Sequence, residues 1–335
     1  MRFSSFTAVN GRKLLSVVLV LLILPYGINS CTGFLRRRAQ TVAEDVMLED
    51  VPLGGLTAAE SRVVIEQLAR IRDVPPVDAC LDEATGGVVP ELCGRRLDVE
   101  ATLERVLAAG RGEAVAPLFI SVPPAVTLAD FKQHPVYRGN PAKKQVAFLV
   151  NVAWGNEFLP EMLEVLRDAG ARATFFLVGR WVENNRQEAE MIAASGFEIA
   201  SHGYSDAISL SEAPLSVVEE DLRRAGEIIA AVCGRRPQYF SPHKGELSPN
   251  VLAAAAAQEL RVIMWTLDTV DWQLPGVDAM YEKIMQGAAG GSMILMHPTE
   301  QTAEFLRRVI PALRAKGLEP VTVSELLSPD WGHVE

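Results

Sequence analysis

The sequence predicts an α/β protein whose C-terminal half contains a parallel sheet, preceded by a smaller α+β domain. Short apolar runs alternate with stretches of helical spacing from residue 144 onward, which is the pattern of βα units. A chain of 335 residues is too long for one small core and suggests two domains. A composition of 49% hydrophobic and 22% charged residues indicates a globular protein rather than a disordered one.

The net charge indicates which macromolecules the protein is expected to bind. Lys and Arg number 32 against 42 Asp and Glu, so the formal net charge is −10. Non-specific nucleic-acid binding depends on a basic surface, so no nucleic-acid partner is expected. Four cysteines are too few for a disulfide-stapled scaffold.

Residues 1–31 have the pattern of an export signal. Arg2, Arg12 and Lys13 precede the apolar run Leu14–Leu24, which is shorter than the roughly 20 residues that a membrane-spanning helix needs. Cys31 ends a sequence that loosely resembles a lipobox, so the segment is a lipoprotein signal, an uncleaved anchor or a plain cleaved signal. We expect an extracytoplasmic protein, secreted or anchored at the cell envelope, which contacts the membrane through this segment.

Residues 39–125 are expected to form the first, α+β domain, and 126–143 a linker rich in Pro and Gly. Neither stretch contains a catalytic triad, a metal-ligand cluster or a phosphate-binding loop. Cys80 and Cys93 form either a disulfide or two half-buried thiols. The expected elements of the first domain are helices over Ala58–Ile71 and Asp98–Leu107, a strand–turn–strand over Asp78–Val89 and a strand over Val115–Val122.

Residues 144–328 carry the alternating pattern. Right-handed crossovers then place all strand ends on one face of a sheet that is open or closed into a barrel. The seven expected strands are Val146–Val150, Ala173–Leu177, Glu198–Ser201, Gln238–Phe240, Val262–Trp265, Met293–Met296 and Pro320–Val323. The six helical stretches are Glu157–Ala169, Glu183–Ser195, Pro214–Cys233, Ser248–Gln258, Asp278–Gln286 and Gln301–Ala315.

Polar side chains follow several of these strands directly. His202, His243 and His297 are three of only five histidines, and all come just after strand ends. Loops at that face of a βα barrel present side chains for chemistry. Asn151, Ser241, Asp268 and Asp271 occupy equivalent places, so a site is expected there.

Aromatic residues lie near the same strand ends. Trp154, Trp272 and Tyr204 are expected to line a substrate-binding groove, with His243 beside them, because aromatic rings present flat apolar faces for a ligand. Trp265 is expected to lie in the core instead.

The region from Gln145 to Leu327 resembles the NodB-homology polysaccharide deacetylases, and within them the sporulation-associated group. This resemblance implies a distorted (β/α) barrel of about seven strands that hydrolyses acetyl groups of chitin-like, peptidoglycan or xylan polymers. Its motifs are Asn151–Glu157, Ala173–Trp181, Ser201–Ser205, Met264–Trp272 and Ile294–Thr299. Residues 39–125 resemble VanW-type domains, assigned to peptidoglycan binding, through Gly54–Thr57, Gly87–Glu91, Gly94–Glu100 and Pro124–Thr127.

The resemblance assigns roles to three residues. His297, in Leu295-Met296-His297, matches the general acid, and Asp268 matches the carboxylate that orients it. His202 matches the first metal-binding histidine. The reaction also requires a divalent metal such as zinc to activate water, and no other cofactor is implied.

Other positions depart from the family pattern. Asn151 replaces the aspartate base, and an amide cannot accept a proton at neutral pH. Val152 replaces a metal-binding aspartate, and Asp206 replaces the second histidine of the His-x-x-x-His motif. Ser241 stands where an arginine is usual. We therefore expect a degraded metal and base site with weak or absent hydrolysis.

Two interpretations remain open from the sequence. His202, Asp206 and His243 form a rebuilt metal site with Glu157 as base, or the site is kept only to bind a glycan. In either case the expected partner is a cell-wall amino-sugar glycan such as peptidoglycan.

Overall fold

The computed structural model describes residues 40–331. The expected export segment 1–31, including Cys31, lies outside the described residues. From residue 40 to residue 331, no helix is both long and apolar enough to cross a membrane. The chain divides into two compact units: residues up to Val74 with Arg95–Ile120, and Pro75–Gly94 with Ser121 onward. This division differs from the linear boundary expected at residue 125.

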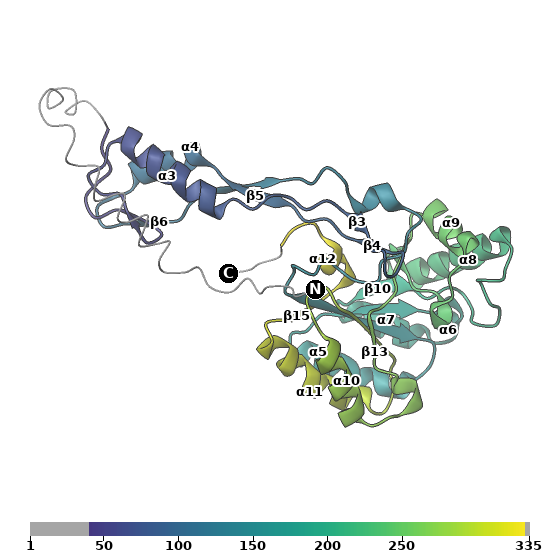
Figure 1. Cartoon of the computed structure of the whole chain (residues 1–335). Helices are drawn as coiled ribbons and strands as arrows, with labels where there is room; N and C mark the ends of the chain where they lie inside the picture. The colour runs from purple at the N-terminus through teal and green to yellow at the C-terminus, as the bar shows by residue number, and fades with distance from the viewer. Residues whose placement is uncertain (1–39, 332–335) are drawn as a thin grey trace, which may run out of the picture. The chain divides into compact units, whose positions relative to one another are not determined.

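The first unit is a small α+β structure. Strand β1 (Met47–Leu48) pairs antiparallel with β2 (Val51–Pro52) and parallel with β6 (Ala114–Val115). Helices α3 (Ala58–Arg72) and α4 (Val99–Ala108) pack on it through one buried apolar cluster (Figure 1). Both helices begin at the cap residues visible in the sequence. Thr57 forms a capping box with Glu60, and Asp98 accepts the Ala101 N–H.

Two short hairpin-like pairs complete the N-terminal part. Strand β5 (Gly94–Leu97) and β7 (Phe119–Val122) form a two-stranded sheet, and β3 (Cys80–Leu81) pairs antiparallel with β4 (Val88–Val89). The β3–β4 pair belongs to the second unit.

The register of this pair excludes the Cys80–Cys93 disulfide. Cys80 lies opposite Val89, so Cys93 is four residues further along the ladder, about 13 Å away at the rise of a strand. A disulfide requires Cα atoms within about 7 Å. Both thiols are free, so the disulfide alternative is wrong.

The second unit is built on an eight-stranded parallel sheet in the order β12-β11-β10-β9-β8-β14-β13, with β15 also pairing with β8. Helices surround the sheet (Figure 1), as the α/β prediction required. The strands are β8 (Gln145–Val152), β9 (Thr174–Leu177), β10 (Glu198–Ser201), β11 (Tyr239–Phe240), β12 (Arg261–Val262), β13 (Leu267–Asp268), β14 (Met293–Met296) and β15 (Glu319–Val321). The α-helices are α5 (Leu159–Asp168), α6 (Gly179–Asn184), α7 (Arg186–Ala194), α8 (Leu215–Cys233), α9 (Pro249–Ala257), α10 (Val277–Gly287), α11 (Thr302–Ala315) and α12 (Val323–Leu327). The 3₁₀ turns are η2 (Leu128–Phe131), η3 (Asn156–Phe158), η4 (His243–Gly245) and η5 (Asp271–Gln273).

The connection between β12 and β13 shows that the sheet curls into a distorted barrel. These two strands are the opposite edges of the sheet, yet only residues 263–266 separate them in sequence. Four residues span at most about 14 Å, so the two edges must approach one another. The strand expected over Val262–Trp265 is therefore placed wrongly: β12 ends at Val262, residues 263–266 form the connection, and β13 lies outside the expected range.

The stretch expected to be a linker covers the β12 edge. Val136 donates its N–H to Val262 O at 2.9 Å and accepts the Met264 N–H at 2.8 Å. It is fully buried. An exposed strand edge needs such a partner or cover, so residues around Val136 are an integral part of the barrel unit rather than a free connection.

Strand β8 shows how the strand period creates two cores. Val146, Phe148, Val150 and Val152 lie in the large cluster shared with the helices, whereas Ala147 and Leu149 lie in the other cluster, on the opposite face of the sheet. Asn151 follows Leu149 in the same alternation. The sequence therefore places Asn151 on the inner face at the carboxyl end of β8.

Candidate functional site

The candidate site lies where the parallel strands end. Asn151 is the last but one residue of β8, His202 follows β10, and Ser241 follows β11. Asp271 lies three residues beyond β13 and His297 directly follows β14. Because all pairings are parallel, these positions share the carboxyl-end face of the sheet.

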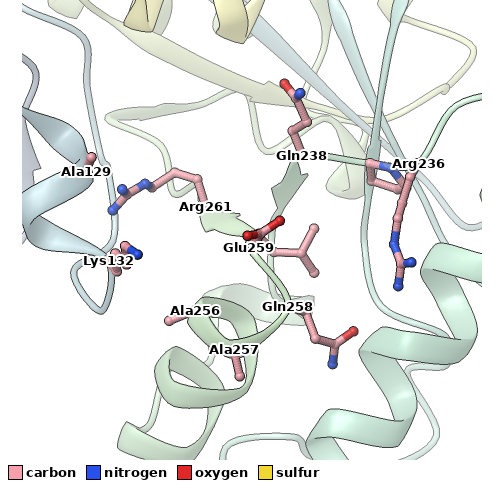
Figure 2. A pocket seen from close by; sticks show the side chains of 11 residues that line it. Ala129, Lys132, Arg236, Gln238, Ala256, Ala257, Gln258, Glu259 and Arg261 are labelled. Atoms are coloured by element: carbon pink, nitrogen blue, oxygen red, sulfur yellow. The ribbon is translucent and has the colours of Figure 1, made fainter.

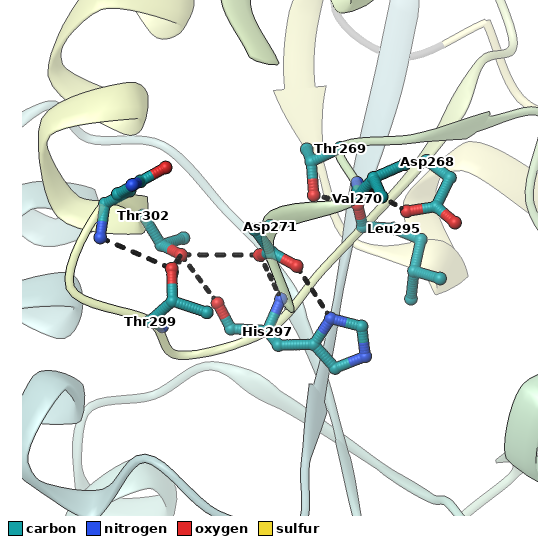
Figure 3. A network of polar contacts seen from close by, with 9 residues as sticks. Asp268, Thr269, Val270, Asp271, Leu295, His297, Thr299 and Thr302 are labelled. Carbon is teal, nitrogen blue, oxygen red and sulfur yellow. Dashed lines mark hydrogen bonds and ion pairs between the residues drawn. The ribbon is translucent and has the colours of Figure 1, made fainter. Parts of the chain in front are cut away.

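His297 and Asp271 form the best-ordered polar pair of this face (Figure 3). The ring Nδ1 of His297 is 2.8 Å from Asp271 Oδ1, and the His297 backbone N–H donates to Asp271 Oδ2 at 2.6 Å. Thr302 Oγ1 donates to His297 O at 2.7 Å. A carboxylate on Nδ1 selects the tautomer protonated there and leaves Nε2 for proton exchange. The pair has the geometry of an oriented acid–base histidine.

The carboxylate beside His297 is Asp271, so the assignment of Asp268 as the orienting residue is wrong. Asp268 Oδ1 instead accepts the backbone N–H of Val270 at 2.8 Å. Val270 has φ of 57°, a left-handed conformation that a β-branched residue adopts only under constraint. The turn held by Asp268 directs Asp271, and not Asp268, toward His297. The sequence contains both acids after one strand and cannot distinguish them.

A hydrogen bond to the segment that follows β11 fixes the ring of His202. Its Nδ1 donates to Ser241 O at 2.6 Å, which leaves Nε2 unprotonated. The ring lies 4.1 Å, centroid to centroid, from that of His243. Burial lowers the pKa of His202 well below its ordinary value, and burial likewise lowers the pKa of His243 to about 4. Both rings are therefore neutral at pH 7.

The side chains at the carboxyl ends of β8 and β11 are uncharged. Asn151 is 4% exposed, and its Oδ1 has no hydrogen-bond partner in the described structure. The Ser241 hydroxyl is likewise buried without a partner. Val152 is fully buried among apolar residues packed against the helices. No proton acceptor of the carboxylate type stands at this point.

The residues present do not fit a resident metal ion. Asp206 is exposed, and the end of β8 offers Asn151 and Val152 rather than carboxylates, so the free Nε2 of His202 has no carboxylate ligand from this strand to join it. Within residues 40–331 no group of three or more His, Cys, Asp or Glu side chains is arranged to hold a metal. His202, Asp206 and His243 thus do not assemble the rebuilt site that was one interpretation of the sequence.

Of the three aromatic residues expected to bind substrate, two lie near the His297–Asp271 pair and the third makes other contacts. Trp154 stacks on His297, with ring centroids 5.9 Å apart and planes 10° apart, and Trp272 is 56% exposed beside Asp271 in η5. Gly155 makes the stacking of Trp154 on His297 possible. Its φ is +81°, and a Cβ at this position would lie 2.0 Å from Pro298 O. Tyr204 instead donates to Glu183 at 2.8 Å and lies under the Arg224 guanidinium at 3.7 Å.

Two contributors were missed by the sequence reasoning. The sequence places Asp271 on this face without assigning it a role, and it places Thr302 only in a helical stretch. The one sequence signal for Thr302 is its place at the start of the helix that follows His297. Which face such a hydroxyl presents depends on the tertiary path of the loop.

Comparison with known proteins identifies relatives of this chain among the polysaccharide deacetylases and the CE4 family. Residues 138–263 match the family model for polysaccharide deacetylase. The uncharacterized protein YlxY of Bacillus subtilis (strain 168) is 36% identical over 255 residues, covering 76% of this chain and 79% of YlxY. The structure of wild-type BA3943 from Bacillus anthracis, described as a CE4 family pseudoenzyme, superimposes with a TM-score of 0.71 at 32% identity, covering 80% of this chain and 95% of BA3943.

The chain belongs to the polysaccharide deacetylase (CE4) family. A peptidoglycan-N-acetylglucosamine deacetylase of Bacillus cereus is 29% identical to it over 189 residues, covering 55% of this chain and 68% of the relative. A BA3943 mutant described as having restored enzymatic activity superimposes with a TM-score of 0.71 at 31% identity, covering 80% of this chain and 98% of that one.

CE4 deacetylases are generally metal-dependent, so the site of this chain is unusual for the family. It has an oriented histidine, His297, and has Asn151 and Val152, neither of them a carboxylate, at the end of β8.

Proposed function

We propose that this protein acts on N-acetylated amino-sugar glycan of the cell wall, such as peptidoglycan, and hydrolyses its acetyl groups very slowly or not at all. The observation that carries the proposal is the asymmetry of the site. His297 and Asp271 keep the geometry of a general acid, whereas Asn151 and Val152 stand where a base and a metal ligand would be.

The roles of the chain's own residues follow from this geometry. With Asp271 on Nδ1, His297 presents Nε2 to the nitrogen of the leaving amine and can donate a proton there. The exposed rings of Trp154 and Trp272 offer planes on which sugar rings pack. Asn151 offers a neutral acceptor instead of a base, so water activation is the step that this chain lacks.

The other segments of the chain suggest that the protein works at the cell envelope. We infer that residues 1–31 direct export and that residues 39–125 form a VanW-type domain that contacts peptidoglycan, with residues 144–328 as the deacetylase domain. The resemblance to the sporulation-associated group suggests a role at the spore or sporulating cell wall. Deacetylase relatives that act on peptidoglycan support an extracytoplasmic location.

Restoring the missing carboxylates tests the proposal. In Asn151→Asp/Val152→Asp we expect acetate release from a soluble N-acetylglucosamine oligomer, with added zinc, to rise at least tenfold above wild type. The matched control adds His297→Ala to the same pair, and its acetate release should fall back toward the wild-type level. A double variant that folds but shows no gain would contradict the assignment of Asn151 and Val152 as the defect.

Binding is tested separately from turnover. Trp272→Ala should weaken retention of the protein on purified peptidoglycan, while Leu274→Ala, an exposed apolar neighbour on the same loop, should not. Unchanged retention in Trp272→Ala would place glycan contact away from His297.

A further inference from the structure

A cavity of about 850 Å³ lies in the barrel unit, and Figure 2 shows the side chains that line it. Its walls come from the amino ends of β11 and β12, the end of α9 and the η2 turn. Because the strands are parallel, His202, Asp271 and His297 lie beyond the other ends of these strands. The cavity is therefore separate from the candidate site.

The lining of this cavity is basic although the chain as a whole has a formal net charge of −10. Lys132, Arg236 and Arg261 line it, against the single carboxylate of Glu259. None of the three cations forms an ion pair with any residue from 40 to 331. The Glu91 carboxylate attracts Arg261 and Glu259 lies in the lining, so cations exceed carboxylates here by three to two, and an anionic ligand would be attracted to this excess.

Arg261 is the fixed member of the group. Its guanidinium donates to Leu128 O at 2.6 Å and also to the carbonyl oxygens of Phe131 and His134. These acceptors are neutral and hold the guanidinium in place, and the Glu91 carboxylate offsets part of its charge without forming an ion pair with it. Burial lowers the pKa of Arg261, although an arginine stays charged at neutral pH.

Lys132 and Arg236 are the exposed members. The Arg236 side chain lies along α8, with Nε 3.8 Å from where a Cβ on Gly226 would be, and makes no other polar contact in the described residues. Both side chains can therefore turn to a ligand without losing an existing partner. Gln258 donates its Nε2 to Glu219 O at 2.8 Å, which leaves its Oε1 to accept from a hydroxyl group.

The size of the cavity indicates more than a single ion. Cavities that hold small organic ligands measure about 300–1,000 Å³. Arg and Lys together suit phosphate oxygens, and the amides of Gln238 and Gln258 suit hydroxyl groups. A polyol or sugar carrying phosphate satisfies both sets of groups.

We propose that this cavity binds phosphate groups of an anionic wall polymer, with Lys132 and Arg236 contacting phosphate and Arg261 supplying a fixed positive charge. The inference takes the cell-wall location from the proposed function but uses none of the residues around His297.

A labelled poly(glycerol phosphate) oligomer is the probe, titrated against the folded chain by fluorescence anisotropy at two salt concentrations. In Lys132→Gln/Arg236→Gln we expect at least tenfold weaker binding and a shallower dependence on salt. Arg186→Gln/Lys283→Gln is the matched control, because both residues are exposed, lack ion pairs and lie outside the cavity lining. Equal weakening in both pairs would attribute binding to net charge and overturn the site.

Two further measurements test whether the cavity recognises phosphate rather than any anion, and whether it acts separately from peptidoglycan binding. A poly-glutamate probe of similar charge should bind at least tenfold more weakly, and equal binding would overturn the assignment to phosphate. Peptidoglycan stripped of phosphate polymers should still retain Lys132→Gln/Arg236→Gln as well as wild type. A chain that binds stripped peptidoglycan but not poly(glycerol phosphate) would refute this cavity's role and leave the proposed function standing.

Discussion

His297 keeps its orientation through contacts from one carboxylate. Asp271 is fully buried and accepts the backbone N–H and the Nδ1 proton of His297, with Thr302 Oγ1 3.4 Å from Oδ2. Asp268, three residues earlier, only holds the turn. The two acids therefore have separable effects although they follow the same strand.

The first prediction distinguishes the two acids without relying on turnover. Asp271→Asn should remove the hydrogen-bonded Nδ1 proton resonance of His297 in the NMR spectrum, and lower the free energy of unfolding by about 2 kcal/mol or more, because a buried charge-assisted acceptor is lost. Asp268→Asn should leave that resonance in place, since its amide oxygen still accepts from Val270. Loss of the resonance in Asp268→Asn instead would restore Asp268 as the partner.

At the scale of elements, the loop after β8 determines the aromatic environment of His297. Trp154 reaches His297 because Gly155 passes against the Pro298 carbonyl in a left-handed conformation. Any side chain at position 155 must displace the segment that follows His297. The stacking of Trp154 therefore depends on a backbone contact rather than on the tryptophan alone.

Gly155→Ala tests this contact. We expect the free energy of unfolding to fall by about 3 kcal/mol, from left-handed strain and the clash with Pro298 O together. Gly170→Ala is the matched control, because Gly170 has φ of 57° and open space around its Cβ position, so only the cost of about 1–2 kcal/mol for strain applies. Equal losses in urea denaturation would show that the Pro298 contact contributes nothing.

The C-terminal helix α12 depends on a buried lysine. Lys143 is 1% exposed and donates its Nζ to Glu325 O at 2.6 Å and Ser328 O at 2.9 Å. Burial lowers the pKa of Lys143 to about 8. In the unfolded chain the group keeps a pKa near 10.4, so between pH 8 and pH 10 the unfolded state binds more protons.

Stability should therefore rise with pH in that window. From pH 8 to pH 9.5 we expect wild type to gain about 1–2 kcal/mol in free energy of unfolding relative to Lys143→Met, which lacks the titrating group. Guanidinium denaturation of both proteins at the two pH values measures the difference. Parallel curves for the two proteins would show that Lys143 titrates normally when folded.

At the scale of the whole molecule, the barrel unit has the family architecture, and its carboxyl-end face carries Asn151, Val152 and Ser241 beside the His297–Asp271 pair. The fold does not depend on the missing ligands, because apolar clusters on both faces of the sheet hold it together. The barrel therefore does not need a bound metal in order to fold.

Metal content of the purified protein from about residue 32 onward is the corresponding measurement. We expect well under one zinc, cobalt or manganese ion per chain by elemental mass spectrometry, even after incubation with excess metal, and Asn151→Asp/Val152→Asp should take up metal. About one ion per wild-type chain, lost in His202→Ala, would mean that His202 and other residues rebuild a site after all.

The sequence by itself determined the alternation of strands and helices, the caps at Thr57 and Asp98, and the polar residues that follow the strands. These features are local, since apolar period and cap chemistry act within a few residues. It also shows that Asn151 cannot act as a base and that Val152 cannot ligate a metal in any fold, because an amide does not accept a proton at neutral pH and an isopropyl group has no donor atom.

Only the tertiary structure decided which residues meet. The pairing of Asp271 with His297 joins positions 26 residues apart and depends on the left-handed turn at Val270. The separation of Cys80 from Cys93 depends on strand register, and the approach of β12 to β13 depends on how the sheet curls. Such contacts follow from the packing of whole elements, and no spacing along the chain specifies them.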